Sequence, residues 1–215
     1  SINIARLIPQ SFYYFEAYKQ VKKFGKEIVF SVPSGNFGNL TAGLMAKRMG
    51  LPVKRFIAAT NINKIVPEYL SSGIYNPKPS QATISNAMDV GNPSNFVRIL
   101  DLYNKDFVAI SKDVSGFWLD DNETKEAMKE AYQKYRYICD PHGAIGYKSL
   151  HNLDANEIGL FLETAHPAKF LDTVESTLDI KIEIPEGLAS IADKTKQAIK
   201  MESDFQSFKS YLLLR

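Results

Sequence analysis

Residues 28–59, IVFSVPSGNFGNLTAGLMAKRMGLPVKRFIAA, decide the fold of the chain. They open with a continuous apolar run, residues 28–32, as expected for a strand that is buried on both faces of a sheet. A glycine-containing turn leads to residues 38–49, which are apolar on most faces and are followed by Gly50, a common helix stop. Residues 53–59 are expected to form the next strand. Strand, helix and strand within about thirty residues predict a parallel crossover unit.

The rest of the chain repeats this alternation of short apolar runs and helical periods. We therefore expect an α/β fold with an open, mainly parallel sheet flanked by helices. Residues 76–93 carry three prolines among Ser, Asn and Gly, which predicts an irregular loop, and long ordered loops of this kind are often functional. The pattern predicts these further elements: a helix over 3–24 that kinks at Pro9, a helix opened by Asp120 and Glu123 that runs to about Arg136, a short helix from Pro141, a strand over 158–163 and a helix through Leu178.

The chain has 215 residues, enough for one large domain or one domain with an appended lobe. We expect a large α/β part over residues 1–184 and short helices over residues 185–215 that cover the same domain. The first residue is Ser and the patterned segment begins almost at once, so we expect the start to be a boundary within a longer polypeptide.

Charge and cysteine content exclude several classes of partner. Lys and Arg total 26 against 24 Asp and Glu, a formal charge of +2, so we expect no surface for nucleic acid, and any anion site must be local. No apolar run is long enough to cross a bilayer and no export signal opens the chain, so we expect no membrane partner. The single cysteine, Cys139, allows no intramolecular disulfide and fits a reducing compartment.

The turn from Val32 to Asn39 has the features of an anion-binding site. Gly35 and Gly38 are expected to adopt positive φ and to let the backbone approach a ligand, while the helix start offers unpaired N–H groups. The turn lacks the lysine of a P-loop and the spacing of a dinucleotide fingerprint, which favours a monophosphate ester as the ligand. The alternative is a tight turn that needs glycine for backbone reasons only.

Four motifs in order along the chain resemble those of one family. They are residues 1–6 (SINIAR), 34–39 (SGNFGN), 86–96 (NAMDVGNPSNF) and 163–170 (ETAHPAKF). Together they resemble threonine synthase. The resemblance implies a cytoplasmic enzyme of threonine biosynthesis with the fold of the tryptophan synthase β, or fold-type-II, pyridoxal-phosphate enzymes. It also implies conversion of O-phospho-L-homoserine and water to L-threonine and phosphate.

The chain departs from this family in one respect. The family's Schiff-base lysine lies upstream, in a segment resembling Thr-Leu-Ala-Phe-Lys-Asp, and no such segment occurs here. The chain therefore resembles the C-terminal part, with no catalytic residue of its own, and we expect it to be inactive alone. Its expected partner is the N-terminal part of its own polypeptide, and without that part an uncovered surface should favour self-association.

The resemblance implies cofactor-binding residues in two places. The phosphate of pyridoxal 5′-phosphate would bind the loop Ser34, Gly35, Asn36, Phe37, Gly38 and Asn39, mainly through backbone N–H groups. Thr164 resembles the hydroxyl residue that bonds the pyridine nitrogen; the alternative is an N-cap of the helix that follows it.

The resemblance also implies substrate-binding residues. His166 and Lys169 would neutralise the substrate phosphate, or else His166 is structural and Lys169 simply solvated. Ser1, Asn3 and Arg6 would bind a phosphate or carboxylate, or else form an N-cap followed by an exposed arginine. Turn chemistry alone explains Asn86, Asp89 and Asn95, so they receive no role.

The remaining candidate residues do not point to a metal or a nucleophile. His142, His151 and His166 lack the paired spacing of zinc ligands, and we expect His142 to be structural. Cys139 is expected to be a packed side chain. Two other functions stay open: another fold-type-II lyase, which the motifs argue against, and a non-catalytic protein that binds a phosphorylated ligand. A gene that encodes the upstream lysine segment would favour the enzyme.

Overall fold

The computed structural model describes residues 3–192, 194–195 and 197–214. The chain divides into two units between Ile182 and Glu183. The first unit holds the sheet and all the segments that bear on the candidate site.

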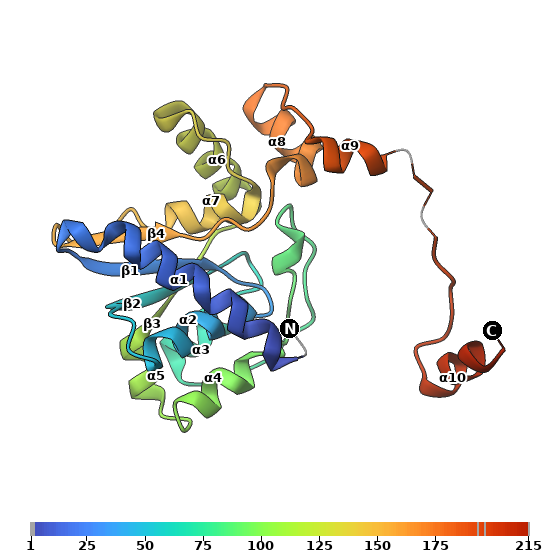
Figure 1. The fold of residues 1–215 in the computed structure, drawn as a ribbon, viewed down its shortest axis with the longest axis horizontal. Helices are drawn as coiled ribbons and strands as arrows, with labels where there is room; N and C mark the ends of the chain where they lie inside the picture. The colour runs from blue at the N-terminus through green and yellow to red at the C-terminus, as the bar shows by residue number, and fades with distance from the viewer. Residues whose placement is uncertain (1–2, 193, 196, 215) are drawn as a thin grey trace. The chain divides into compact units, whose positions relative to one another are not determined.

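A four-stranded parallel sheet forms the centre of the first unit (Figure 1). Its strand order is β3-β2-β1-β4. The strands are β1 (Glu27–Pro33), β2 (Arg55–Thr60), β3 (Val114–Trp118) and β4 (Glu157–Phe161). The prediction of an α/β fold with an open parallel sheet is confirmed, and three of the strands lie within two residues of their predicted bounds.

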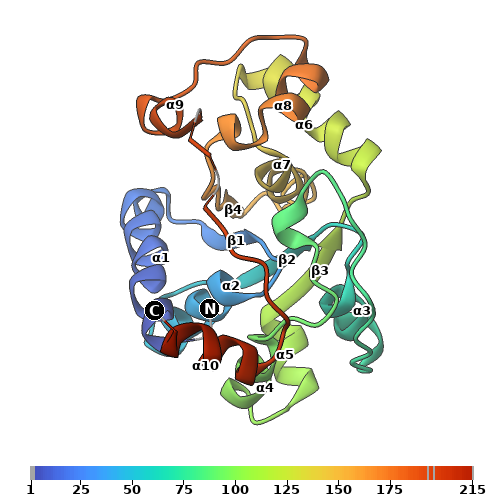
Figure 2. The same ribbon diagram turned by 90° about the vertical axis from the view of Figure 1, so that its right-hand side faces the viewer.

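Helices cover both faces of this sheet. One buried cluster joins the sheet to α1 and α2, and a second joins it to α6, α7 and α8, which Figure 2 shows as a separate group of helices. The helices of the first unit are η1 (Ile4–Arg6), α1 (Leu7–Val21), η2 (Lys22–Phe24), α2 (Gly38–Arg48), α3 (Ile65–Ser72), η3 (Asn86–Met88), α4 (Phe96–Leu102), α5 (Phe107–Asp113), α6 (Asp121–Tyr135), α7 (Pro141–Lys148), η4 (Pro167–Phe170) and α8 (Leu171–Leu178), where η denotes a 3-10 helix.

Tyr14 of α1 contacts both strands of the crossover unit and the start of its helix. Its ring lies edge-on to Phe30 of β1, with centroids 4.9 Å apart, and to Phe56 of β2, 5.8 Å apart. Its hydroxyl donates hydrogen bonds of 2.8 and 2.9 Å to the carbonyl oxygen and Oδ1 of Asn39 at the start of α2. This fully buried residue therefore connects the core of the sheet to the beginning of the helix.

Several local predictions can be compared with the structure. Asp120 and Glu123 form the predicted capping box of α6, with hydrogen bonds of 2.8 and 2.9 Å. The single helix predicted over residues 3–24 is instead η1, α1 and η2 in succession. Pro9 is the third residue of α1, where an N–H group would have no helical partner, so it does not interrupt the helix as predicted.

The second unit contains two short helices, α9 (Glu186–Ala192) and α10 (Phe205–Leu213). Short helices in this part of the chain were predicted, whereas their packing as a cover stays a prediction. Among the described residues, no helix has the length and apolar character needed to span a membrane.

Candidate functional site

The segment Ser34–Asn39 joins the end of β1 to the start of α2. The Ser34 N–H donates to the carbonyl of Ala59 at 2.8 Å, and its hydroxyl donates to the carbonyl of Val32 at 2.8 Å. Phe37, the N-cap of α2, has φ 60° and ψ 16°. Residues 34–39 thus form a sharp turn, here called the cup, at the carboxyl end of a central strand.

The residue with positive φ in the cup is Phe37, and the prediction that Gly35 or Gly38 would adopt it is wrong. Burial of the ring and hydrogen bonds to the carbonyl explain why a bulky residue tolerates this conformation. The Phe37 side chain is buried, and its carbonyl accepts hydrogen bonds from the N–H and the hydroxyl of Thr41, at 3.0 and 2.7 Å. These contacts hold the left-handed backbone in place.

Gly35 is needed for space. A Cβ atom at this position would lie 2.2 Å from the Ala87 carbonyl oxygen and 2.9 Å from the Met88 Cα. Both neighbours are backbone atoms of η3, which cannot rotate away. The glycine therefore permits a close approach between the cup and the loop of residues 76–93.

The backbone N–H groups of the cup are available to a ligand. The first helical bond of α2 runs from Thr41 to Phe37, and within the described part of the chain no acceptor is bonded to the N–H groups of residues 35–40. A helix start with unpaired donors and the positive end of the peptide dipoles favours an anion. The cup therefore fits the phosphate group that the sequence led us to expect.

The asparagines of the cup are held by other segments. Asn36 Oδ1 accepts hydrogen bonds from the Ser94 N–H and hydroxyl, at 2.6 and 2.9 Å, and its carbonyl accepts one from Asn95 Nδ2 at 2.9 Å. Asn39 Oδ1 accepts from Tyr14. Both side-chain oxygens are occupied by protein donors, so these residues shape the cup from its two ends.

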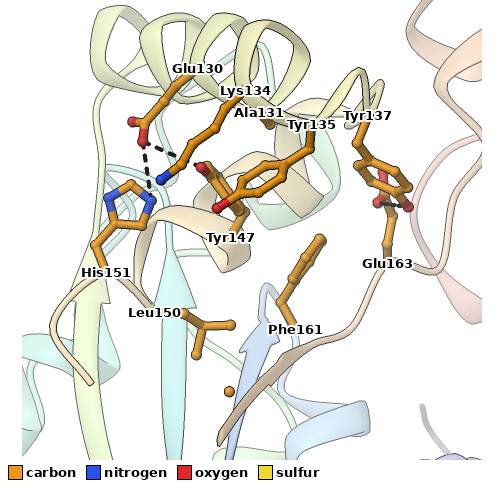
Figure 3. Close-up of a pocket in the computed structure, with 11 residues that line it drawn as sticks. Glu130, Ala131, Lys134, Tyr135, Tyr137, Tyr147, Leu150, His151, Phe161 and Glu163 are labelled. Carbon is orange, nitrogen blue, oxygen red and sulfur yellow. Dashed lines mark hydrogen bonds and ion pairs between the residues drawn. The ribbon is translucent and has the colours of Figure 1, made fainter. Parts of the chain in front are cut away.

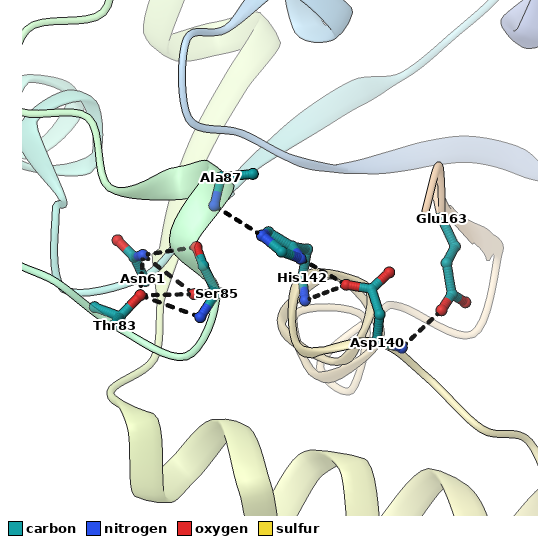
Figure 4. Close-up of polar contacts among 7 residues, drawn as sticks. All are labelled: Asn61, Thr83, Ser85, Ala87, Asp140, His142 and Glu163. Carbon is teal, nitrogen blue, oxygen red and sulfur yellow. Dashed lines mark hydrogen bonds and ion pairs between the residues drawn. The ribbon is translucent and has the colours of Figure 1, made fainter. Parts of the chain in front are cut away.

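The loop of residues 76–93 is anchored by Asn61, which follows β2 and is buried (Figure 4). Asn61 Nδ2 donates to Thr83 Oγ1 at 2.8 Å and to Asp89 Oδ1 at 2.9 Å. Asp89 Oδ2 accepts from the Thr83 N–H at 3.0 Å. Asn61 and Thr83 were not among the predicted site residues; the one available signal was that Asn61 lies two residues after the end of a predicted strand.

His142 connects three segments around the cup. Its Nδ1 lies 2.6 Å from Asp140 Oδ1, and its Nε2 accepts a hydrogen bond from the Ala87 N–H at 3.2 Å (Figure 4). Its ring contacts Phe170, with centroids 4.8 Å apart. His142 was predicted to be structural because a lone histidine usually is, and its partners Ala87 and Phe170 could not be predicted because they are distant in the sequence.

Thr164 lies at the same edge of the sheet as the cup. Ser31 of β1 pairs with Phe161 of β4, so Ser34 and Thr164 each come three residues after paired positions on neighbouring parallel strands. Ligands of open α/β sheets bind at this edge. Thr164 is exposed and does not cap the next helix, because the N-cap of η4 is His166.

The substrate candidates are only partly placed by the structure. His166 and Lys169 are both exposed, and His166 Nδ1 accepts from the Ala168 N–H at 3.1 Å. Asn3 is the N-cap of η1, accepting from the Ala5 N–H at 2.9 Å, and Arg6 is exposed at the end of η1. Ser1 lies outside the described residues. Within the described chain, no hydrogen bond joins Asn3 or Arg6 to the cup.

A separate cavity of about 980 Å³ lies beside β4 and shares no residue with the cup (Figure 3). Glu130 there contacts Lys148, at 2.6 Å, and His151, at 3.4 Å, and the hydrogen bond from Lys148 lowers the pKa of its carboxyl group. Burial and the nearby Glu130 raise the pKa of Tyr147 to about 12. The lining residues are Glu130, Ala131, Lys134, Tyr135, Tyr137, Tyr147, Leu150, His151, Gly159, Phe161 and Glu163.

Glu163 lines this cavity and directly precedes Thr164 in the sequence. It accepts hydrogen bonds from the Tyr137 hydroxyl at 2.6 Å and from the Asp140 N–H at 2.9 Å. Burial raises the pKa of the Glu163 carboxyl group and, together with the bond to Glu163, that of the Tyr137 phenol. Among the described residues, no three His, Cys, Asp or Glu side chains are grouped so as to hold a metal ion.

The open parallel sheet with helices on both faces matches the fold of the fold-type-II pyridoxal-phosphate enzymes. More distant structures show the fold alone: maize serine racemase aligns with a TM-score of 0.52 and 16% identity over 78% of this chain and 52% of that one. The chain is homologous to threonine synthase over about half of that enzyme's length.

Comparisons of sequence support this relationship. Residues 143–212 match a family described as "Threonine synthase, C-terminal". The chain is 48% identical to threonine synthase of Haemophilus influenzae and 45% identical to that of Escherichia coli, over 99% of this chain and 50% of each relative. The chain therefore spans about half the length of these curated relatives.

Solved structures agree with the sequence comparisons. The crystal structure of threonine synthase from Escherichia coli aligns with a TM-score of 0.92 and 44% identity, over 99% of this chain and 50% of that one. Threonine synthase from Brucella melitensis, whose structure is described as bound to PLP, aligns with a TM-score of 0.85 and 30% identity, over 99% and 51% of the two chains.

Proposed function

We propose that this chain supplies the phosphate-binding part of a threonine synthase active site. The reaction would convert O-phospho-L-homoserine and water to L-threonine and phosphate, in threonine biosynthesis in the cytoplasm. The observation that carries the proposal is the row of free N–H groups over residues 35–40 at the start of α2, in a chain 45–48% identical to threonine synthases.

The residues of the cup fit the phosphate of pyridoxal 5′-phosphate. Free amides and the close backbone approach at Gly35 suit a phosphate group, and the cup is partly open to solvent at Asn36. Thr164, at the same sheet edge, would hydrogen-bond the pyridine nitrogen. The bound cofactor would act as an electron sink for carbanion chemistry. The protein groups named here would hold and orient it.

The substrate phosphate would be neutralised by side chains near the other motifs. His166 and Lys169 are exposed and lie in the segment that contacts His142 through Phe170. Ser1, Asn3 and Arg6 are proposed to bind the substrate once the rest of the active site is present. Arg6 would provide a fork for a phosphate or carboxylate group.

Catalysis would require a part of the polypeptide upstream of this chain. The segment resembling Thr-Leu-Ala-Phe-Lys-Asp does not occur in the sequence, so the lysine of the reaction would have to come from that part. With the chain alone, we expect the cup to bind phosphate compounds reversibly and without turnover. A non-catalytic phosphate-binding protein would have the same cup. Adding the upstream part of the polypeptide distinguishes this alternative from the enzyme, because only the enzyme would gain threonine synthase activity.

The test uses the chain as it is, with pyridoxal 5′-phosphate as the probe and pyridoxal, which lacks the phosphate, as the matched control. Nuclear magnetic resonance of ¹⁵N-labelled protein should show pyridoxal 5′-phosphate shifting the amide signals of residues 35–40, and inorganic phosphate should compete. Pyridoxal should leave these signals unchanged. Binding that leaves residues 35–40 unaffected would overturn the proposal.

A second measurement addresses the absent lysine. Borohydride reduction followed by peptide mass spectrometry should give no stoichiometric adduct on one lysine. A single modified lysine would contradict the proposed need for an upstream residue, and Lys169 is the first position to check.

A further inference from the structure

The His142 side chain contacts the loop of η3, the start of α7 and the end of η4 together. It is the second residue of α7, whose N-cap is Asp140, and its side chain is 11% exposed. Three contacts, to Asp140, the Ala87 N–H and the Phe170 ring, occupy both ring nitrogens and one face. The imidazole is therefore held in one orientation.

These contacts determine where the ring proton resides. A backbone N–H can only donate, so the nitrogen that faces Ala87, Nε2, must carry no proton. The single proton of the neutral ring is then on Nδ1, from which it is donated to Asp140 Oδ1 at 2.6 Å. The geometry thus assigns the donor role to Nδ1 and the acceptor role to Nε2.

Ala87 transmits this contact to the cup. It belongs to η3, a single turn closed by hydrogen bonds from Met88 to Ser85, at 2.9 Å, and from Asp89 to Asn86, at 3.1 Å. On one side its N–H bonds to His142; on the other its carbonyl oxygen packs directly against Gly35. A shift of η3 away from His142 would therefore alter the backbone that supports the cup.

We propose that His142 is a positioning residue for the cup, and that the ring with Nε2 unprotonated is the form that supports anion binding. This inference rests on the proposed function of the cup. It assigns His142 no contact with cofactor or substrate. Its action passes through the Ala87 N–H to the backbone at Gly35.

The inference predicts a particular dependence on pH. A proton on Nε2 would place two N–H groups face to face and remove the hydrogen bond from Ala87. Asp140 is the acidic group that faces the ring, and its N–H is bonded to Glu163, which is in turn bonded to Tyr137. On η3 the ring contacts the Ala87 backbone, and the nearby Asp89 carboxylate is hydrogen-bonded to Thr83. On η4 the ring contacts the apolar Phe170, which follows Lys169 in the sequence. Loss of one hydrogen bond should weaken anion binding by roughly two- to tenfold.

The experiment uses sulfate as the probe, because sulfate keeps its charge throughout the range in which histidine titrates. Sulfate affinity is measured from the amide signals of residues 35–40 between pH 5 and 8, in the wild type, His142→Gln and His142→Phe. Glutamine offers an acceptor oxygen near the place of Nε2 and does not titrate. Phenylalanine keeps the ring against Phe170 and has no acceptor.

The wild type should bind sulfate more weakly at pH 5 than at pH 8, by roughly two- to tenfold. His142→Gln should match the wild type at pH 8 and lose its additional pH dependence. His142→Phe should bind weakly at both pH values. Hydrogen exchange at the Ala87 amide should be faster in His142→Phe than in the wild type and near the wild-type rate in His142→Gln. Urea unfolding of the same proteins measures how much each substitution changes the unfolding free energy.

Two outcomes separate this inference from the proposed function. If the wild type binds neither sulfate nor pyridoxal 5′-phosphate at residues 35–40, the proposed function fails, and the inference fails with it. If the wild type binds both but His142→Phe shows the same sulfate affinity and pH profile, the inference alone is overturned. An equal loss of affinity in His142→Gln and His142→Phe also overturns it, because the role of the acceptor would then be excluded.

Discussion

Replacing Gly35 with alanine tests the close approach on which the cup depends. The added Cβ would lie 2.2 Å from the Ala87 carbonyl oxygen, so the two backbones must separate by about 0.8 Å to reach 3.0 Å, below which such contacts essentially do not occur. Gly35 does not have positive φ, so the substitution adds steric overlap without left-handed strain. We expect a loss of unfolding free energy of about 1–3 kcal/mol, as for other overpacked sites.

The same displacement should weaken phosphate binding. Loss of one hydrogen bond to a charged group costs about 1.5–3 kcal/mol, so the dissociation constant for phosphate should rise at least about tenfold. Urea unfolding measures the stability, and titration of the amide signals with phosphate measures the affinity. The variant is expected to keep the fold, because the overlap is confined to one contact.

Two further glycines provide controls. Gly116→Ala overlaps the backbone of Pro67 at 2.7 Å, in β3 and away from the cup, so it should lose stability and retain phosphate affinity. Gly187→Ala meets no atom within 4 Å and should change neither property. Wild-type stability and affinity in Gly35→Ala would refute the steric argument, and an equal loss of affinity in Gly116→Ala would show that the effect is not specific to the cup.

Three other predictions concern the body of the domain. Burial alone raises the pKa of Glu157, but a backbone amide and the cations of Arg55 and Lys54 outweigh burial and lower it to about 2. The stability that comes from this lowered pKa is fully present above the pKa of the unfolded chain, about 4.5, and is lost as the pH falls toward 2. Glu157→Gln should therefore lower the unfolding free energy by about 3 kcal/mol at pH 7 and reduce its loss at acid pH, as measured by urea unfolding at each pH. Identical dependence of the unfolding free energy on pH in both proteins would contradict this. Burial and two nearby carboxylates raise the pKa of the Cys139 thiol, so iodoacetamide should modify it only in the unfolded protein. Mass spectrometry measures the labelling, and rapid labelling of the native protein would contradict this prediction. Phe12 is 61% exposed on an apolar face of α1, so we expect the wild type to self-associate and Phe12→Asp to reduce the increase of its molar mass with concentration in light scattering. A wild type that stays monomeric at every concentration would exclude self-association.

The strands that the sequence predicted are those with continuous apolar runs. β1 and β2 are interior strands that are buried over most of their length, and β4, although it is an edge strand, is buried or half-buried at every position. The missed strand, β3, is an edge strand of five residues, VSGFW, whose burial alternates along its length. Its third and fifth residues are exposed, whereas no residue of β4 is, so its sequence needs no continuous apolar run. Its existence depends on the long-range pairing.

The candidate site divides in the same way. The free amides of the cup could be predicted, because a strand, a short turn and a helix start are local features. The conformation of Phe37 could not, because burial and the contacts of Thr41 impose it. Nor could the contacts of Asn61 with Asp89, 28 residues away, or of Ala87 with His142, 55 residues away.

The contacts of the cup also show why it needs more than its own sequence. Ser94 holds Asn36, Tyr14 holds Asn39, and Ala87 packs against Gly35, so three distant segments fix the ends and the base of one short turn. An anion bound by backbone amides depends on the direction of those amides, since each bond weakens steeply as it bends. The affinity of the cup is therefore a property of the segments around it. For this reason the loop of residues 76–93 and α1 belong to the site although neither is proposed to contact the phosphate.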